Sequence, residues 1–224
     1  MSNLQHNDEA PYAKYLSRIV RPFPNFDFFF IKSVRQRAVD WLQLWDGARV
    51  LDLGCGGGGS FPYLARAVGP TGSVTGVDIS HQSCINAMRR IDSNEWKHIT
   101  VMEASAQNVS LAGLYDGALM FAAPDVYASE AALENIFPHL REGARVVLFG
   151  AKLSEGRLGK CLNPLLQQLV VKLSPNTPIP EKEPWALIAK RVENFCLEEY
   201  FFGSMFLAAG TVSRRGLIGT KHQP

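Results

Sequence analysis

The 224-residue sequence has no paired cysteines, no long apolar run and little net charge. Its four cysteines are Cys55, Cys84, Cys161 and Cys196, with no C-x-x-C pair and no histidine at ligand spacing. Neither a zinc site nor a disulfide framework is therefore predicted, and no metal site is expected. Buried free thiols are the simpler interpretation, because unpaired cysteine behaves as a small apolar residue.

Membrane and nucleic-acid partners are also disfavoured. No apolar run approaches the roughly 20 residues that a membrane-spanning helix needs. The first ten residues include Asp8 and Glu9 and contain no apolar segment typical of a signal peptide. The net charge is only +2, from 23 basic and 21 acidic side chains, so a broad phosphate-binding surface is not indicated. We expect a cytoplasmic protein without stable membrane insertion and without a nucleic-acid partner.

The middle of the chain alternates between the apolar period of a strand and that of a helix. We expect strands at 48–54, 73–78, 99–103, 115–121 and 144–151, and helices at 60–67, 81–91 and 129–140. The strands are almost continuously apolar, which parallel strands covered by helices on both faces require. Together with two strands expected in a hairpin near the C-terminus, these five strands predict an α/β fold, with a Rossmann-like, doubly wound, mostly parallel sheet of seven strands.

The two ends have a different pattern. An aromatic-rich lead precedes a helix expected at 31–44, so residues 1–45 are interpreted as an N-terminal lid and first helix, and 46–224 as one domain. An amphipathic helix is expected at 155–173, inside an insertion at 155–193 that would line a pocket. A short helix follows from about Pro184. The stretch 195–214 predicts an antiparallel hairpin around Gly203 and Ser204.

A run of glycines follows the first expected strand. Glycine has no Cβ and accepts positive φ, so this backbone can approach a ligand closely. Gly54, Gly56 and Gly59 also satisfy the dinucleotide pattern G-x-G-x-x-G, which by itself leaves a nicotinamide enzyme open. Asp52 argues against that enzyme, because a carboxylate here would repel a pyrophosphate but would attract an ammonium or a sulfonium. Ser60 is expected to cap the helix that follows.

Three segments together resemble a known family. The pattern D-x-G-x-G-x-G after an apolar strand resembles the first motif of class I methyltransferases that use S-adenosylmethionine (SAM). The segment ending at Asp78 is similar to the family's second strand, whose terminal acid binds both ribose hydroxyls. Ala104 to Val109 matches the family's G-D-A-x-x-L segment, with Ser105 in place of the acid that contacts adenine. The resemblance spans residues 46–151, and it implies that 46–224 is a methyltransferase domain.

The resemblance implies SAM as the cofactor and S-adenosylhomocysteine (SAH) as its product. The residues expected to bind the cofactor are Asp52, Gly54, Cys55, Gly56, Gly58, Asp78, Ile79, Ser105, Ala106 and Phe121. Tyr12 and Tyr15 are expected near the substrate, where an aromatic ring would attract the sulfonium. No catalytic base is assigned, and four titratable residues are candidates for that role: His81, His98, His139 and Asp125.

The residues after the fourth expected strand narrow the range of possible methyl acceptors. Enzymes that methylate planar amines resemble one another in an Asn/Asp-Pro-Pro-aromatic segment, whereas this chain reads Phe121-Ala122-Ala123-Pro124-Asp125. A Pro-Cys nucleophile and an arsenite-type cysteine set are also missing. The remaining resemblance is to ubiquinone, menaquinone and phospholipid methyltransferases. It implies SN2 transfer of a methyl group to a small apolar or amphiphilic acceptor, which needs orientation and, for an acidic acceptor, proton removal.

Two other functions stay open from the sequence. The substitution at Ser105 leaves room for a SAM-binding protein without catalysis, and the glycine pattern leaves room for a nicotinamide-dependent oxidoreductase. We expect a small-molecule acceptor as the partner, and a homodimer is an open expectation.

Overall fold

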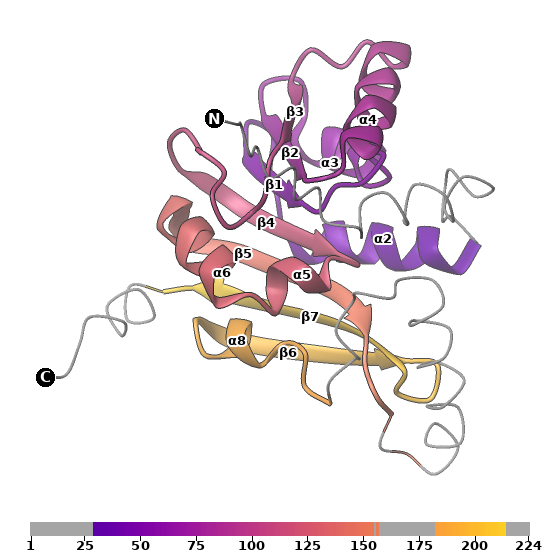
Figure 1. The fold of residues 1–224 in the computed structure, drawn as a ribbon, viewed down its shortest axis with the longest axis vertical. Coiled ribbons are helices and arrows are strands. Elements are labelled where there is room, and N and C mark those ends of the chain that lie inside the picture. The colour runs from indigo at the N-terminus through magenta and orange to yellow at the C-terminus, as the bar shows by residue number, and fades with distance from the viewer. Residues whose placement is uncertain (1–28, 155, 157–181, 214–224) are drawn as a thin grey trace, which may run out of the picture.

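A single mixed sheet organises the described part of the chain, which comprises residues 29–154, 156 and 182–213 of the computed structural model (Figure 1). The sheet has seven strands in the order β3-β2-β1-β4-β5-β7-β6. Strands β1 to β5 pair in parallel, whereas β7 is antiparallel to both β5 and β6. The expected doubly wound, mostly parallel sheet with a terminal hairpin is confirmed. The strands are β1 Arg49–Leu53, β2 Ser73–Asp78, β3 Ile99–Glu103, β4 Tyr115–Phe121, β5 Leu140–Ala151, β6 Val192–Tyr200 and β7 Met205–Val212.

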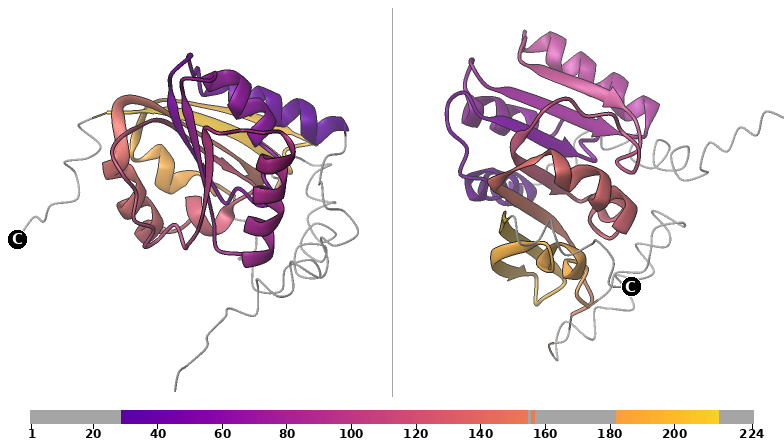
Figure 2. Two further views of the ribbon diagram at one scale, coloured as in Figure 1. Left: turned by 90° about the horizontal axis from the view of Figure 1, so that it is seen from above. Right: turned by 90° about the vertical axis from the view of Figure 1, so that its left-hand side faces the viewer.

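Helices cover both faces of the sheet, as Figures 1 and 2 show. Apolar residues of α2, α3 and α4 share one core with one face, and those of α5, α6 and α8 share a second core with the other face. These helices are α2 Phe29–Trp41, α3 Phe61–Val68, α4 His81–Ser93, α5 Pro124–Tyr127, α6 Glu130–Ile136 and α8 Ala186–Ala189, with a 3₁₀ turn, η1, at Phe137–His139.

Strand β4 explains why the strands read as continuous apolar runs. All seven of its residues are buried. Ala118 and Met120 belong to the core under α5, α6 and α8, whereas Leu119 and Phe121 belong to the core under α2, α3 and α4. Because successive side chains point to opposite faces, a strand covered on both sides needs apolar residues at every position. The sequence pattern therefore identified the central strands correctly.

Several element boundaries differ from the expected ones. The helix expected at 129–140 ends at Ile136, because Pro138 cannot donate a helical N–H and the chain tightens into η1. Strand β5 then begins at Leu140, four residues earlier than expected. A bulge makes this possible, because Tyr115 pairs with Leu140 while Gly117 pairs with Arg145.

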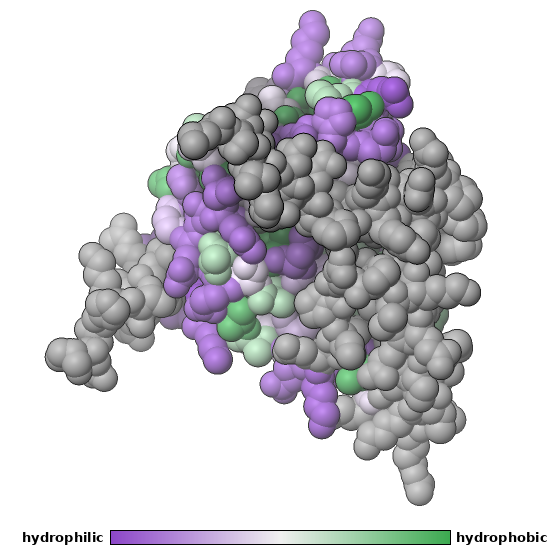
Figure 3. Space-filling model, in the orientation of Figure 1, coloured by the Kyte–Doolittle hydropathy of each residue, from purple (hydrophilic) through white to green (hydrophobic). Residues whose placement is uncertain are grey.

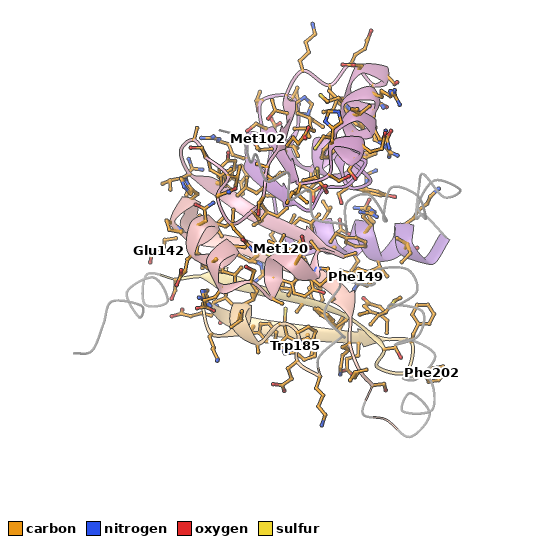
Figure 4. The ribbon with its side chains drawn as sticks, viewed as in Figure 1. Met102, Met120, Glu142, Phe149, Trp185 and Phe202 are labelled. Carbon is orange, nitrogen blue, oxygen red and sulfur yellow. The ribbon has the colours of Figure 1, made fainter. Side chains whose placement is uncertain are left out.

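The C-terminal hairpin begins earlier than expected and has a strained turn. Strand β6 starts at Val192 rather than near 195. Phe201 and Phe202 have φ values of 49° and 56°, and Gly203 follows at 78°. The left-handed region is uncommon for bulky residues. Phe202 marks the tip of the hairpin, and the arrowheads of β4, β5 and β6 point toward this same edge of the sheet (Figures 1 and 4).

Several sequence expectations fall outside the described residues. These are the lead with Tyr12 and Tyr15, and the amphipathic helix at 155–173. The division at residue 45 and the insertion at 155–193 stay predictions.

Within the described residues, no helix is long and apolar enough to span a bilayer, and no cluster of His, Cys, Asp and Glu could hold a metal ion. Hydrophilic side chains dominate the described surface over α4 in Figure 3.

Candidate cofactor-binding site

The expected cofactor residues meet at the carboxyl edge of the sheet. Strand β1 lies between β2 and β4, so the chain leaves β1 toward one side and later returns to place β4 on the other. In open α/β sheets, such a reversal of strand order produces a crevice outside the carboxyl ends of the strands. The glycine loop follows β1, Asp78 ends β2, Ser105 follows β3 and Phe121 ends β4.

The glycine loop is a tight left-handed turn against β2. The N–H groups of Gly54 and Cys55 both donate to the carbonyl of Val77, at 2.8 and 3.1 Å. Gly54, Gly56 and Gly58 have φ values of 70°, 54° and 74°. A side chain at Gly54 would lie 2.6 Å from Cβ of Ala123 in the loop after β4. Glycine is therefore required here both for conformation and for close approach.

Asp52 is a buried carboxylate with spare bonding capacity. Its side chain is only 1% exposed, and its Oδ2 has no hydrogen-bond partner among the described residues. Burial raises the pKa of Asp52 to about 7, against an opposing attraction to Arg35 and a hydrogen bond from Ser60, while Asp78 adds repulsion. Leaving a buried polar atom unpaired is costly, so such an atom indicates a place for a ligand.

Arg35 of α2 supplies a positive charge beside this carboxylate. Its Nη1 donates to Oγ of Ser60 at 2.8 Å, and its Cζ lies 4.0 Å from the ring centroid of Phe121. Ser60 occupies the N-cap position of α3, but its side chain makes no capping hydrogen bond. Ser60 therefore occupies the expected N-cap position, but its hydroxyl is engaged by Arg35 and not by an N–H group of the helix.

Asp78 ties the glycine loop to the end of β2. Its carboxylate accepts hydrogen bonds from the N–H groups of Gly56 at 2.7 Å and Ser80 at 2.9 Å. Burial raises the pKa of Asp78 despite these bonds, and repulsion from Asp125 adds to the effect. A carboxylate has about four acceptor positions, so it can still accept from two hydroxyl groups.

The residues expected around the adenine differ in their exposure and in their hydrogen bonds. Ile79 is 51% exposed at this edge, which leaves an apolar surface for a ring. Oγ of Ser105 accepts from the N–H of Gln107 at 3.3 Å and so closes its own turn. Ala106 is buried, and its carbonyl accepts from the side chain of Asn135 at 3.1 Å. Ser105 therefore has a local structural role in the turn after β3.

Cys55 and Phe121 are buried beneath the site. Burial raises the pKa of the Cys55 thiol well above its usual range, so the thiol is protonated and unreactive at neutral pH. The ring of Phe121 stacks on Phe149 with centroids 4.5 Å apart. These residues present backbone and apolar surface rather than reactive groups.

Comparisons with known proteins agree with this geometry. A family model described as a methyltransferase domain matches residues 50–143. A 2-phytyl-1,4-naphtoquinone methyltransferase of Thermosynechococcus vestitus is 47% identical over 58 residues, which is 26% of each chain. A demethylmenaquinone methyltransferase of Symbiobacterium thermophilum is 27% identical over 199 residues, covering 79% of this chain and 77% of that relative. The chain therefore carries a methyltransferase domain over residues 50–143, in agreement with its resemblance to class I SAM-dependent methyltransferases.

A solved structure shows the same fold. Geranyl diphosphate C-methyltransferase from Streptomyces coelicolor A3(2) superposes on this methyltransferase with a TM-score of 0.69 at 15% identity, over 93% of this chain and 86% of that one. The chain spans 26% and 34% of the length of two of the curated relatives it matches. That solved structure contains S-adenosyl-L-homocysteine, the product form of the cofactor that the sequence predicts for this chain.

The sequence interpretation missed Arg35 of the methyltransferase. The helical pattern placed Val34, Ala38, Trp41 and Leu42 on one side of the helix expected at 31–44, and all are buried except the half-buried Trp41. It gave no reason to single out the neighbouring arginine, because only the packing of α2 places Arg35 beside Ser60 and Phe121. A basic residue bordering an apolar stripe was the one available signal.

Replacing Asp78 by alanine tests its expected role. Two hydrogen bonds to a charged acceptor would be lost, each worth roughly 1.5–3 kcal/mol, so SAM affinity should fall at least about tenfold in a calorimetric titration. Asp92 of α4 is an exposed acid, and Asp92→Ala serves as the matched control with unchanged affinity. A variant of Asp78 that binds SAM like the parent would show that another residue holds the ribose.

Proposed function

We propose that this methyltransferase binds SAM at the carboxyl edge of β1, β2 and β4 and transfers its methyl group to a reduced quinone or a similar lipophilic hydroxyarene. The observation that carries the proposal is the pair formed by Asp52 and Arg35 beside an open glycine loop. The buried, unpartnered Oδ2 of Asp52 fits an ammonium group, and the half-buried guanidinium of Arg35 fits a carboxylate.

These two charges complement the amino-acid end of SAM, which carries one ammonium and one carboxylate. Asp78 at the end of β2 would accept hydrogen bonds from the ribose hydroxyls, and Ile79 would cover one face of the adenine. No atom lies within 4 Å of a Cβ built on Gly56, so the loop leaves space above it. A pyrophosphate above this loop would instead meet Asp52, which argues against a nicotinamide cofactor.

The acceptor class is supported by relatives and by the apolar surroundings. The demethylmenaquinone methyltransferase aligns over 79% of this chain, and the phytyl naphthoquinone enzyme has the higher local identity. Phe121 and Phe149 stack at the carboxyl ends of adjacent strands β4 and β5. Apolar and aromatic walls with a few polar groups are typical of pockets for small molecules.

The reaction requires little covalent chemistry from the protein. SAM supplies a methyl group on a positively charged sulfur. The protein has to orient the acceptor in line with that methyl group, exclude water and accept one proton from a hydroxyl group. Arg35 and Asp52 would fix the amino-acid end, so that binding energy from this end positions the reacting centre.

The proposal is tested by incubating the protein with SAM and 2-prenyl-1,4-naphthoquinol kept reduced with dithionite. We expect a product heavier by one methyl group, detected by mass spectrometry, with one SAH formed per product. The oxidised quinone is the matched control and should not react, because its ring carbon is not nucleophilic. SAM binding without product from the quinol would contradict the acceptor class. Absence of SAM binding would contradict the whole proposal.

The lid expected over the site is retained as part of the proposal. Residues 1–28 precede α2, and α2 packs on the sheet through Ile31, Val34 and Ala38. A truncation that begins at Ile31 should therefore keep most of the helix that belongs to the scaffold. Its turnover should fall much more than its melting temperature if the lead closes the reaction site.

A further inference from the structure

Two of the four titratable residues considered as bases lie at the wrong edge of the sheet. The carbonyl of His98 accepts from the N–H of Val74 near the start of β2. Nδ1 of His139 lies 3.2 Å from the carbonyl of Gly113, which precedes β4. Both histidines are therefore at the amino edge, a full strand length from the glycine loop, and neither can reach a methyl acceptor there.

Two cationic side chains at the carboxyl edge, those of His81 and Lys152, are paired with glutamates. His81 is largely exposed, and its Nδ1 lies 2.6 Å from the carboxylate of Glu103. Lys152, just after β5, is buried and forms an ion pair with Glu199 of β6. A group whose proton or charge is held by a partner is a poor acceptor for a substrate proton.

Asp125 has a different position. It belongs to the first turn of α5, directly after β4, and its side chain is solvent-accessible. Ala123, two residues earlier, packs on the glycine loop at Gly54. The segment that carries Asp125 therefore borders the crevice at the junction between the cofactor loop and the end of β4.

The backbone before Asp125 is strained. Ala122 has φ = 59°, which is unusual for a residue other than glycine. Its N–H donates to the carbonyl of Phe149 at 2.8 Å, so the neighbouring strand β5 holds this conformation. Such strain is concentrated at functional sites. Here it turns the chain from β4 into α5 at the edge of the crevice.

Desolvation by the surrounding protein keeps the Asp125 carboxyl from being a simple surface acid. Surrounding protein raises the pKa of Asp125, and its charge in turn repels Asp78 across the crevice. On α6, which packs against α5, Glu130 pairs with Arg191 and Glu134 is exposed. No described residue is recorded as an ion-pair partner of Asp125.

We propose that Asp125 is the general base that accepts the hydroxyl proton of the methyl acceptor. The inference rests on the proposed function, because it requires an acceptor with an acidic hydroxyl group. It assigns the crevice a third carboxylate, whose role differs from those of Asp52 and Asp78, which face the cofactor.

The proton and electron balance of the step is simple. The Asp125 carboxylate takes the proton of a quinol O–H, and the oxygen's electron pair moves into the ring. The adjacent ring carbon forms a bond to the methyl group, and the carbon–sulfur electron pair stays on sulfur in SAH. Loss of the ring proton to solvent restores the aromatic ring while Asp125 returns its proton to the oxygen. One proton is released for each methyl group transferred.

The kinetic test compares Asp125→Asn with the parent and with Glu134→Gln, an exposed acid on α6. With 2-prenyl-1,4-naphthoquinol at pH 7, kcat of Asp125→Asn should fall roughly 100-fold or more, while its SAM affinity stays within twofold. In the parent, kcat should fall as pH drops through the raised pKa of Asp125, and the variant should lack this dependence. The deficit should shrink near pH 10, where the quinol ionises without help. Unchanged kcat would overturn the proposal.

A second measurement does not depend on turnover. Carboxyl groups are labelled with a water-soluble carbodiimide and an amine, and the labelled peptides are quantified by mass spectrometry. SAH should protect Asp78 but leave Asp125 reactive, whereas SAH with 1,4-naphthoquinol should protect both. Protection of Asp125 by SAH alone would overturn the proposal, because Asp125 would then face the cofactor. If the parent methylates no quinol, the proposed function fails on its acceptor, and labelling still decides whether Asp125 faces the acceptor side.

Discussion

Asp52→Asn should make the cofactor-free protein more stable at pH 8 while weakening SAM binding by about 100-fold or more. Burial raises the pKa of Asp52 to about 7, compared with about 3.9 for an unperturbed aspartate. A carboxyl with a raised pKa in the folded state stabilises the fold below its unfolded pKa. That contribution is lost as pH rises from about 4 through 7, and it amounts to on the order of 4 kcal/mol.

The asparagine variant should lose this dependence on pH. Its free energy of unfolding should match that of the parent near pH 4 and exceed it by a few kcal/mol at pH 8, less whatever the attraction between Asp52 and Arg35 contributes. SAM binding should suffer because an ammonium would face a neutral amide instead of a carboxylate. The measurements are urea unfolding at several pH values and calorimetric titration with SAM.

Asp116 provides a matched control for Asp52. It is also buried, but its carboxylate pairs with Arg141 and accepts from the N–H of Arg49 at 2.8 Å. Asp116→Asn should therefore destabilise the protein and leave SAM affinity unchanged, because this pair lies at the amino edge. A less stable Asp52→Asn protein at pH 8 would mean that the Asp52 carboxylate is stabilised by partners in the free protein, contrary to our expectation.

Gly54→Ala should both destabilise the fold and abolish SAM binding. The residue has φ = 70°, and an added Cβ would lie 2.6 Å from Cβ of Ala123. Left-handed strain of about 1 kcal/mol and overpacking of about 1–3 kcal/mol should together lower the free energy of unfolding by about 2–4 kcal/mol. The methyl group would also push the loop after β4 away from the glycine loop, which would separate the two walls of the crevice.

Substitutions at two other glycines distinguish the effect of backbone strain from the effect of a steric clash. Gly143 in β5 has φ = 82° and no atom within 4 Å of an added Cβ, so Gly143→Ala should cost only about 1 kcal/mol and bind SAM normally. Gly56 has φ = 54° and equally open surroundings, but it lies in the cofactor loop. Gly56→Ala should keep most of the stability and lose SAM affinity. Normal binding by Gly54→Ala would show that the cofactor does not approach this loop.

The features that the sequence predicted correctly are those that short local patterns determine. Strands such as β4, the glycine loop and Asp78 at the end of β2 follow from apolar runs, glycine conformation and motif order, which are properties of short segments. The position of Arg35 follows from how α2 packs across the sheet, and no spacing in the sequence contains that information. The hydroxyl of Ser60 turned from the cap to Arg35 for the same reason.

The region after β4 is a second place where tertiary packing, which the sequence pattern does not contain, determines the role of a residue. Asp125 was considered from the sequence together with three histidines, and residue type could not rank the four. The sheet separates them, because His98 and His139 lie at the amino edge whereas Asp125 borders the glycine loop. The helix expected at 129–140 ends at Ile136 because of Pro138. The apolar pattern continues past this proline, so the pattern alone did not locate the end of the helix.

The order of strands also constrains how the protein is made. β7 is the last strand of the described chain, yet it lies between β5 and β6. While a nascent chain emerges from the ribosome, β5 therefore presents an unpaired apolar edge that includes Val147 and Phe149 until residues 205–212 have left the exit tunnel. Such edges attract other chains. Slow translation or a shortage of holdase chaperones should therefore reduce the yield of this protein more than that of a sheet whose strands pair in the order of synthesis.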